Sequence, residues 1–418
     1  MITIEHIKKI YKNNKTIFNN FVNLWILQFI RLSTPLILIP ILVNSIGIEK
    51  YGLVIFAQTL VLYFIIFLNF GFEMSATRQI SVNRKDPDKL AEIITSTLII
   101  KIIILFLSII IYSVMLIFIP IMSSNFHLFL FSFLFTIQSL FIPIWFFQGI
   151  EKMRFLTIVD AISRLFFLLL VVLFISTPDD YLLVPIFRFL GLIIATIFSL
   201  YFVFIKERIR LKVITYNDLK LSFREGLPFF YSYLSSVVNA RSNTLLLGVY
   251  TGMTIVAYYD FVSKVVEALN AIYGTFIKVL YPHISATKNR YKAKKAFQFN
   301  LFISLFGYIV LCILAKNIST LFFGDTTFPL HTLFYLLGLL MPLVAIEWSL
   351  GDLYLAPFNY SKEYSLTSIY STLFYIIVLF VLYIFSLISL YSLVVAIIAR
   401  FIFISLYRYY YCRKYKLI

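Results

Sequence analysis

The segment that decides the fold of this chain is residues 93–120, IITSTLIIKIIILFLSIIIYSVMLIFIP, in which Lys101 is the only charged residue. A run of about 20 apolar residues is long enough to cross the hydrocarbon core of a bilayer as a helix. Arg84 and Lys85 precede the segment, whereas the short polar stretch 123–125 that follows it carries no charge. Because positive residues flank membrane helices on the cytoplasmic side, this segment predicts a spanning helix that leaves the cytoplasm.

The same pattern recurs from end to end of the chain, which is 61% hydrophobic and only 13% charged. This composition excludes a soluble globular domain. We predict an all-α, polytopic membrane protein with about twelve transmembrane helices in two six-helix bundles. The predicted spans are 17–46, 51–73, 93–120, 126–149, 156–178, 181–205, 227–250, 253–282, 296–322, 328–350, 364–386 and 388–411.

Lysine and arginine are concentrated in alternate gaps between these spans. About 26 lie in the gaps assigned to the cytoplasm, Arg408 in the tail among them, against Lys50 and Lys316 on the opposite side. We therefore expect a multi-pass protein of the bacterial inner membrane with both termini in the cytoplasm. The charged stretch 1–14 predicts a retained N-terminus without a removable signal peptide. The net charge of +17 is then explained by topology and by contact with anionic membrane lipids, not by nucleic-acid binding.

The longest cytoplasmic connection lies near the middle of the chain. It predicts an N-terminal six-helix bundle at 1–205, a cytoplasmic linker at 206–226 and a C-terminal bundle at 227–418, in which helices 7 and 8 join helices 9–12. Two halves with an even number of helices insert in the same orientation, as in transporters whose substrate site lies between the halves. The loops on the outer face are too short to fold into a catalytic domain.

Two deep arginines are the first candidate site residues. Arg31 and Arg241 each lie about 14 residues into a span, which places them about 21 Å from its cytoplasmic end. Pro35 removes a backbone donor and favours a bend next to Arg31. Pairing with acids or snorkelling to an interface is the alternative interpretation, but the depth favours cations that face a cavity.

The eighth span carries Asp260, Lys264 and Glu267 at i, i+4 and i+7, which places them on one helical face. Lys264 is either a cation that leaves Asp260 or Glu267 when an anionic ligand arrives, or a member of a permanent ion pair. Asp160 and Arg164 repeat the i, i+4 spacing in the fifth span. For these two residues, a local ion pair that eases insertion is as good an explanation as a ligand site.

The remaining ionisable residues within spans are mostly cations. Arg188 and Arg400 lie in the sixth and twelfth spans, whereas Glu347 and Asp352 lie toward the cytoplasm, where we expect an interface role. Lys101 is close enough to the cytoplasmic end of its span to snorkel. The excess of buried cations over acids suits a di-anionic head group such as a pyrophosphate and disfavours a cationic drug.

Aromatic residues make up 19% of the chain, and we expect most of them to serve packing and membrane interfaces. A wall that stacks on sugars is the alternative interpretation of five tyrosines: Tyr231, Tyr233, Tyr258, Tyr259 and Tyr273. Asn239, Asn243 and Asn270 would supply uncharged hydrogen bonds to sugars.

The sequence lacks the motifs of ATPases, metal sites and common hydrolytic active sites. No Gly-rich loop ends in Gly-Lys-Ser/Thr, so no built-in ATPase is expected. The four histidines are scattered without a partner at i+3 or i+4, which argues against a metal site. No spacing indicates a catalytic triad or a carboxylate pair, so we predict no catalytic residue and no cofactor, and a function in transport.

Short motifs in order along the chain carry a resemblance to a known family. Besides the mid-span Arg31, they are Gly47–Gly52 (GIEKYG), Asn69–Phe72 (NFGF) followed by Ala76–Arg78 (ATR), Trp145–Met153 (WFFQGIEKM) and Leu280–Ser285 (LYPHIS). With them the chain resembles the O-antigen flippases of the Wzx type, in the polysaccharide transport family of the multidrug/oligosaccharidyl-lipid/polysaccharide exporter superfamily. The likeness extends over essentially the whole chain.

The resemblance implies a twelve-helix transporter that alternates between inward-open and outward-open states. Its substrate would be an undecaprenyl-pyrophosphate-linked O-antigen repeat unit, carried from the cytoplasmic to the periplasmic leaflet by coupling to an ion gradient, with the polysaccharide polymerase and chain-length regulator as further partners. Substrate-binding roles map onto Arg31, Arg241 and Lys264, and then onto Arg188 and Arg164. Gating or ion-pair roles map onto Asp260, Glu267, Asp160 and Pro35.

Two alternatives belong to other classes of protein. An integral-membrane glycan polymerase or ligase would act on the same lipid-linked sugars, but it should carry a large periplasmic loop. A multidrug or cation antiporter of the same superfamily would share the fold, but its deep acids should outnumber its deep cations. The sequence shows neither feature.

Overall fold

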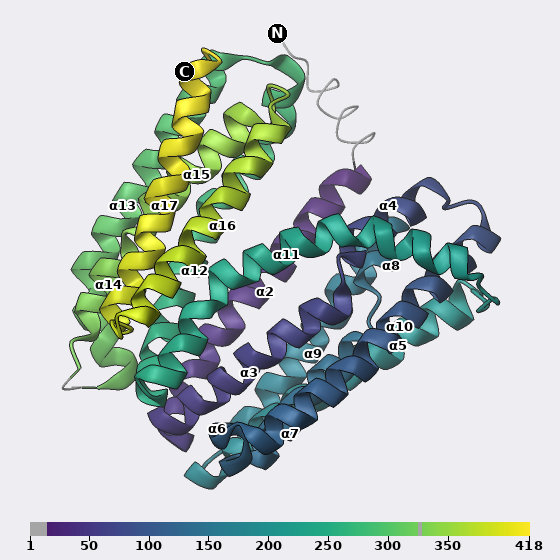
Figure 1. The fold of residues 1–418 in the computed structure, drawn as a ribbon, viewed down its shortest axis with the longest axis horizontal. Coiled ribbons are helices and arrows are strands. Elements are labelled where there is room, and N and C mark those ends of the chain that lie inside the picture. The colour runs from purple at the N-terminus through teal and green to yellow at the C-terminus, as the bar shows by residue number, and fades with distance from the viewer. Residues whose placement is uncertain (1–14, 325–327) are drawn as a thin grey trace. The chain divides into compact units, whose positions relative to one another are not determined.

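The computed structural model describes residues 15–324 and 328–418, and among these it contains helices and no strand (Figure 1). This confirms the all-α prediction. Three of the elements are not α-helical: η1 is a 3₁₀ helix, and η2 and η3 are π-helices. The elements are α2 (Lys15–Ile46), α3 (Ile48–Asn69), α4 (Phe72–Val82), α5 (Pro87–Phe118), α6 (Pro120–Ser124), α7 (Phe126–Ser139), α8 (Ile144–Gly149), α9 (Met153–Phe174), η1 (Pro178–Leu182), α10 (Leu183–Leu200), η2 (Tyr201–Lys206), α11 (Tyr216–Tyr250), α12 (Met253–Thr287), α13 (Arg290–Phe323), α14 (Leu330–Gly338), α15 (Leu340–Trp348), η3 (Ser349–Leu355), α16 (Ser361–Ile384) and α17 (Leu390–Lys414).

Every predicted span is helical over most of its length, although 51–73, 126–149, 181–205 and 328–350 each comprise two or three consecutive elements. Nine helical segments of the described chain are long and apolar enough to cross a membrane. The other predicted spans fall on α2, of which Leu32–Ile46 is a shorter apolar helix, and on α11 and α12. Both of these last helices have 35 residues, but charged and polar side chains interrupt them. Such side chains within a membrane protein face protein or water, so α11 and α12 are where a polar site is expected. The nine segments are Ile48–Val82, Pro87–Phe118, Phe126–Gly149, Thr157–Phe174, Pro178–Lys206, Arg290–Phe323, Leu330–Leu355, Ser361–Ile384 and Leu390–Lys414.

A turn interrupts the segment that contains α3 and α4. Phe70 and Gly71 both have positive φ, 42° and 73°, and α4 begins directly after them. A Cβ at Gly71 would lie 2.5 Å from the carbonyl oxygen of Gly226 in α11. Glycine is therefore required here both by its backbone conformation and by the close approach of α11.

A second break separates α7 from α8. α7 ends at Ser139, and α8 begins after Pro143, which cannot donate a backbone hydrogen bond. The ammonium of Lys101 is buried and donates to the carbonyl oxygen of Ser139 at 2.8 Å. The expectation that Lys101 snorkels is therefore wrong, because the carbonyl at the end of α7 lacks an intrahelical partner and attracts the cation.

Contacts divide the chain into two compact units. Unit 1 consists of Ala57–Leu234 and the described residues up to Gly47. Unit 2 consists of Ile48–Phe56 and Ser235–Ile418. The boundaries therefore lie within α3 and α11 and differ from those of the predicted halves, which follow the order of helices along the chain. The predicted linker 206–226 is also partly helical, because α11 already begins at Tyr216.

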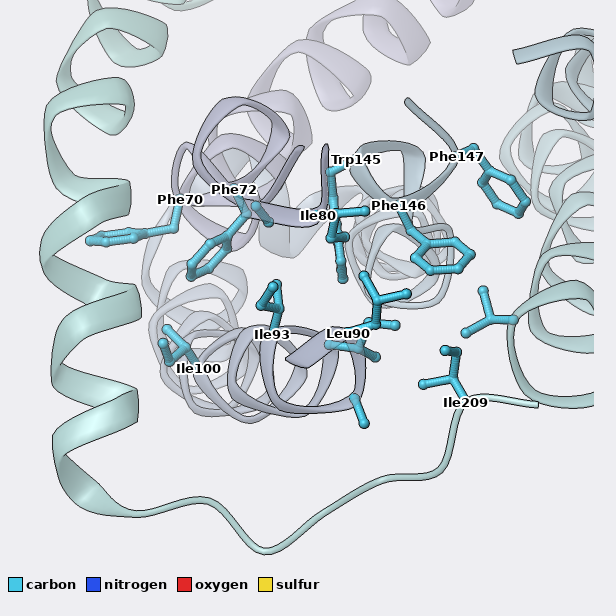
Figure 2. Packing of buried hydrophobic residues seen from close by; sticks show 14 of the residues in the cluster. Phe70, Phe72, Ile80, Leu90, Ile93, Ile100, Trp145, Phe146, Phe147 and Ile209 are labelled. Atoms are coloured by element: carbon cyan, nitrogen blue, oxygen red, sulfur yellow. The ribbon is translucent and has the colours of Figure 1, made fainter. Parts of the chain in front are cut away.

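The core of unit 1 consists of aromatic and aliphatic side chains around α4, α5 and α8. Figure 2 shows Phe70 pointing away from the other labelled residues, and its ring stacks on Phe223 and Phe230 of α11 at 4.5 and 4.9 Å between centroids. Ile209, in the connection before α11, is buried in the same cluster. This cluster fixes the first turns of α11 against the α3–α4 turn.

Candidate functional site

The centre of the candidate site is an ion pair in α12, within unit 2. The ammonium of Lys264 lies 2.6 Å from Oδ2 of Asp260, as the i, i+4 spacing predicts. The hydroxyl of Tyr51 donates to the same oxygen at 2.9 Å. The Asp260 side chain is only 4% exposed, whereas that of Lys264 is 22% exposed. The carboxylate is thus enclosed and hydrogen-bonded, while the cation stays accessible.

Tyr51 reaches this pair from the first turn of α3, and sequence reasoning did not find it. Its neighbour Gly52 explains the contact, because a Cβ there would lie 1.8 Å from the carbonyl oxygen of Met253. The beginnings of α3 and α12 therefore touch backbone to backbone. The sequence signal was present, since Tyr51 and Gly52 end the GIEKYG motif, but the motif did not indicate the partner.

A second, looser ion pair joins α11 to α12. An Arg241 guanidinium nitrogen lies 3.6 Å from a carboxylate oxygen of Glu267. Both side chains are partly exposed, with Glu267 the more open of the two. Arg241 is thus a second candidate cation in unit 2, and it has an acidic partner of its own.

Most of the asparagine and tyrosine side chains of unit 2 that were candidates for binding sugars are buried or hydrogen-bonded to other protein groups. Asn243 donates to the Tyr259 hydroxyl and to the carbonyl oxygen of Leu393, both at 3.1 Å, and accepts from Tyr375. Asn239 donates to Thr372 at 2.8 Å. Tyr258 and Tyr273 are likewise buried, in agreement with packing as the main role of these aromatics.

Unit 1 holds the remaining predicted cations. Arg188 in α10 donates to Oε1 of Gln58 at 2.7 Å and lies over the ring of Phe135, with the guanidinium carbon 4.9 Å from its centroid. Arg164 forms the predicted pair with Asp160 in α9, at 2.9 Å. Both cations therefore already have partners within unit 1.

Two of the predicted site residues, Arg31 and Pro35, lie in α2. Arg31 belongs to α2, but its side chain lies outside the described residues. Pro35 and Pro40 lie within α2, whose helix runs unbroken from Lys15 to Ile46. The roles of Arg31 and Pro35 stay predictions.

One buried charge cluster in unit 2 was not predicted. Arg408, counted above among the tail cations, is 2% exposed and lies 3.6 Å from the carboxylate of Glu347. Arg400 lies 4.0 Å from the same carboxylate. A Cβ at Gly351, in the π-helix η3, would lie 2.4 Å from Arg408 Nη1. An interface role for Glu347 is therefore wrong, because its buried carboxylate is the counter-charge that two buried arginines share.

No group of three or more His, Cys, Asp or Glu side chains in the described part of the chain could hold a metal ion. The site is instead built from cations and hydrogen-bonding groups. Such a set can bind an anion and orient a polar ligand.

Comparison with known sequences gives one family and two relatives. A family described as "Polysaccharide biosynthesis protein" matches residues 17–288. The "Putative O-antigen transporter" of Escherichia coli is 27% identical over 277 residues, which cover 66% of each chain. A protein with the same description from Shigella dysenteriae is 24% identical over 295 residues, covering 69% of this chain and 74% of that one. This chain thus matches about two thirds of the length of the Escherichia coli relative.

Comparison with solved structures supports the fold. The structure "Lipid II flippase MurJ, inward closed conformation" has a TM-score of 0.74 and 15% identity, covering 95% of this chain and 87% of that one. An inward-facing MATE multidrug transporter of the MOP superfamily has a TM-score of 0.71 and 15% identity, covering 94% and 97%. At this identity the likeness shows a common fold alone.

Proposed function

The chain belongs to the polysaccharide biosynthesis protein family, and from this membership we propose that it is a lipid-linked oligosaccharide flippase. It moves undecaprenyl-pyrophosphate-linked repeat units of O-antigen, or of a similar surface polysaccharide, from the cytoplasmic to the periplasmic leaflet by alternating access. It acts as a transporter and not as an enzyme. The names of its two relatives and the fold that it shares with a lipid II flippase support this proposal.

The observation that carries the proposal is the unequal exposure of Lys264 and Asp260. An anion can approach the accessible ammonium without displacing the enclosed carboxylate. Asp260 keeps its hydrogen bond from Tyr51 whether or not Lys264 turns toward a ligand. The buried acid therefore holds the cation in place before the substrate arrives and receives it back after release.

Arg241, with a guanidinium nitrogen 3.6 Å from a carboxylate oxygen of Glu267, supplies a second cation. Together, Lys264 and Arg241 match the two negative charges of a pyrophosphate. Their acidic partners, Asp260 and Glu267, keep the unloaded site close to neutral, which lowers the cost of placing charges at membrane depth. Competition between these acids and the ligand also keeps binding moderate, as a carrier requires.

Arg188 and Arg164 extend the same chemistry to unit 1, and we expect the same of Arg31. The sugars need polar surroundings in place of water, because unpaired hydroxyl groups are costly in an apolar medium. The lipid tail remains in hydrocarbon. We place the protein in the inner membrane and expect an ion gradient to drive the cycle, with the polymerase and chain-length regulator receiving the product.

The test compares cells with and without the gene by locating lipid-linked repeat units with a membrane-impermeant sugar-modifying reagent. Deletion is expected to trap single units in the cytoplasmic leaflet, and the wild-type gene to restore labelling from outside. Lys264→Ala should fail to restore it. Lys316→Ala, which changes an exposed lysine of α13, is the matched control and should restore it fully.

Two other results of the deletion experiment would indicate a different function. Units that reach the periplasm but are not joined would identify a polymerase. An unchanged lipid-linked pool, together with increased sensitivity to cationic drugs, would identify an antiporter.

A further inference from the structure

A half-buried carboxylate in unit 1 has no role in the pyrophosphate site. Glu73 lies in the first turn of α4, just after the α3–α4 turn. Its Oε2 accepts a hydrogen bond from the Tyr233 hydroxyl at 2.9 Å, and its Oε1 lies 3.4 Å from the Asn69 amide nitrogen. A carboxylate has about four acceptor positions, so a strong bond and a long one leave acceptor capacity for a ligand.

The backbone, not the side chains alone, brings Glu73 to Tyr233. A Cβ at Gly71 would lie 2.5 Å from the Gly226 carbonyl oxygen, and one at Gly226 would lie 2.8 Å from that of Phe70. This contact between two glycines sets the α3–α4 turn directly against α11. Tyr233, two helical turns beyond Gly226, then lies beside the first turn of α4.

A row of aromatic rings lies on α3 and α11. Phe67 packs against Phe230 with 5.4 Å between ring centroids, and Phe230 lies 5.7 Å from Tyr231. Phe230 is buried, whereas Phe67 and Tyr231 are 43% and 59% exposed. Phe67 and Tyr231 thus leave exposed aromatic surface on α3 and α11, the helices that also carry Asn69 and Tyr233.

The charge of this group indicates which part of the substrate it accepts. A carboxylate repels a pyrophosphate, so the group cannot be a further phosphate site. The groups that surround the carboxylate, the Tyr233 phenol and the Asn69 amide, are uncharged hydrogen-bonding groups. Neutral hydroxyl groups, which donate to carboxylates and accept from amides, remain the best-matched ligand.

We propose that Asn69, Glu73 and Tyr233 form a saccharide subsite, which binds hydroxyl groups of the repeat unit. This inference rests on the proposed flippase function and adds where the sugar is recognised. The predicted spans 51–73 and 227–250 place the subsite toward their cytoplasmic ends. The sugar is therefore recognised on the side from which the substrate arrives.

The experiment measures binding of two lipids to the full-length protein in nanodiscs by native mass spectrometry. One probe is bare undecaprenyl pyrophosphate, and the other carries the repeat unit extracted from the native host. Glu73→Gln keeps the size of the side chain and an acceptor for Tyr233. It should weaken binding of the sugar-bearing lipid about tenfold, the effect of losing one charge-assisted hydrogen bond, and leave the bare lipid unchanged. Tyr233→Phe should show the same selectivity.

Two controls separate this inference from the proposed function. Glu92→Gln changes a partly exposed acid of α5 that pairs with Lys89, and should affect neither lipid. Lys264→Ala should weaken both lipids, because both carry the pyrophosphate. Wild-type protein that binds neither lipid would contradict the flippase function itself.

Equal binding of the sugar-bearing lipid to wild type, Glu73→Gln and Tyr233→Phe would overturn the subsite. An equal loss for both lipids would also overturn it, because a general structural or electrostatic effect does not distinguish sugar from phosphate. Unchanged affinities with an altered pH dependence of transport would assign Glu73 to ion coupling instead.

Discussion

The ammonium of Lys264 lies 2.6 Å from the carboxylate of Asp260, yet the two side chains differ in exposure, 22% against 4%. The acid is held from a second direction by Tyr51. An ion pair with one enclosed and one accessible member can open in one way only, by movement of the cation. This asymmetry is what the proposed exchange of Lys264 between Asp260 and an anionic ligand requires.

Asp260→Asn is expected to raise the affinity for undecaprenyl pyrophosphate several-fold and to slow transport. The amide still accepts from Tyr51, but it no longer competes with the ligand for Lys264. Binding to protein in nanodiscs and the rate of complementation measure the two effects. Glu92→Gln, in the partly exposed α5 pair with Lys89, is the control and should leave the affinity unchanged. A fall in affinity in Asp260→Asn would contradict the exchange model.

Gly52→Ala should destabilise unit 2, because the new Cβ would lie 1.8 Å from a backbone oxygen that cannot move independently. Overpacking costs about 1–3 kcal/mol, and more where backbone must shift. Gly307→Ala is the matched control, since its Cβ would meet the mobile end of Met341 at 2.9 Å. Thermal unfolding in detergent compares the two. Similar unfolding temperatures for Gly52→Ala and Gly307→Ala would show that the backbone contact between α3 and α12 adjusts easily.

Glu347→Gln should lower the free energy of unfolding by about 3–5 kcal/mol, since it leaves two buried arginines without their counter-charge. Glu49→Gln, at an exposed acid of α3, should stay within about 0.5 kcal/mol of wild type. Denaturant titration of the purified protein measures both. A change of less than about 1 kcal/mol in Glu347→Gln would mean that Arg400 and Arg408 find other partners.

Lys101→Met should destabilise unit 1 by about 1–3 kcal/mol, because the carbonyl oxygen of Ser139 loses its donor in a buried setting. Methionine has nearly the same length, which keeps the packing and removes the charge. Lys85→Met, at an exposed position, is expected to have little effect. If the two variants unfold at the same temperature, water or another donor replaces the ammonium at the helix break.

Helix positions and local ion pairs were predictable because they depend on short stretches of chain. The predicted spans all fall on helices, and Lys264–Asp260 and Arg164–Asp160 form as i, i+4 pairs. Residues whose surroundings come from distant segments were less predictable. Arg408 looked like a tail cation and Lys101 like a snorkelling one, because hydropathy reports depth along a helix and not what packs against it.

The sequence by itself therefore determined that this is an all-helical membrane protein with cations at depth, since hydropathy and charge act residue by residue. Only the tertiary structure decided that Tyr51 donates a hydrogen bond to Asp260, 209 residues away in the sequence, and that Tyr233 donates one to Glu73, 160 residues away. Both hydrogen bonds depend on a glycine, Gly52 or Gly71, at which two backbone segments are in contact. Contacts of this kind follow from the packing of whole helices, which no local pattern records.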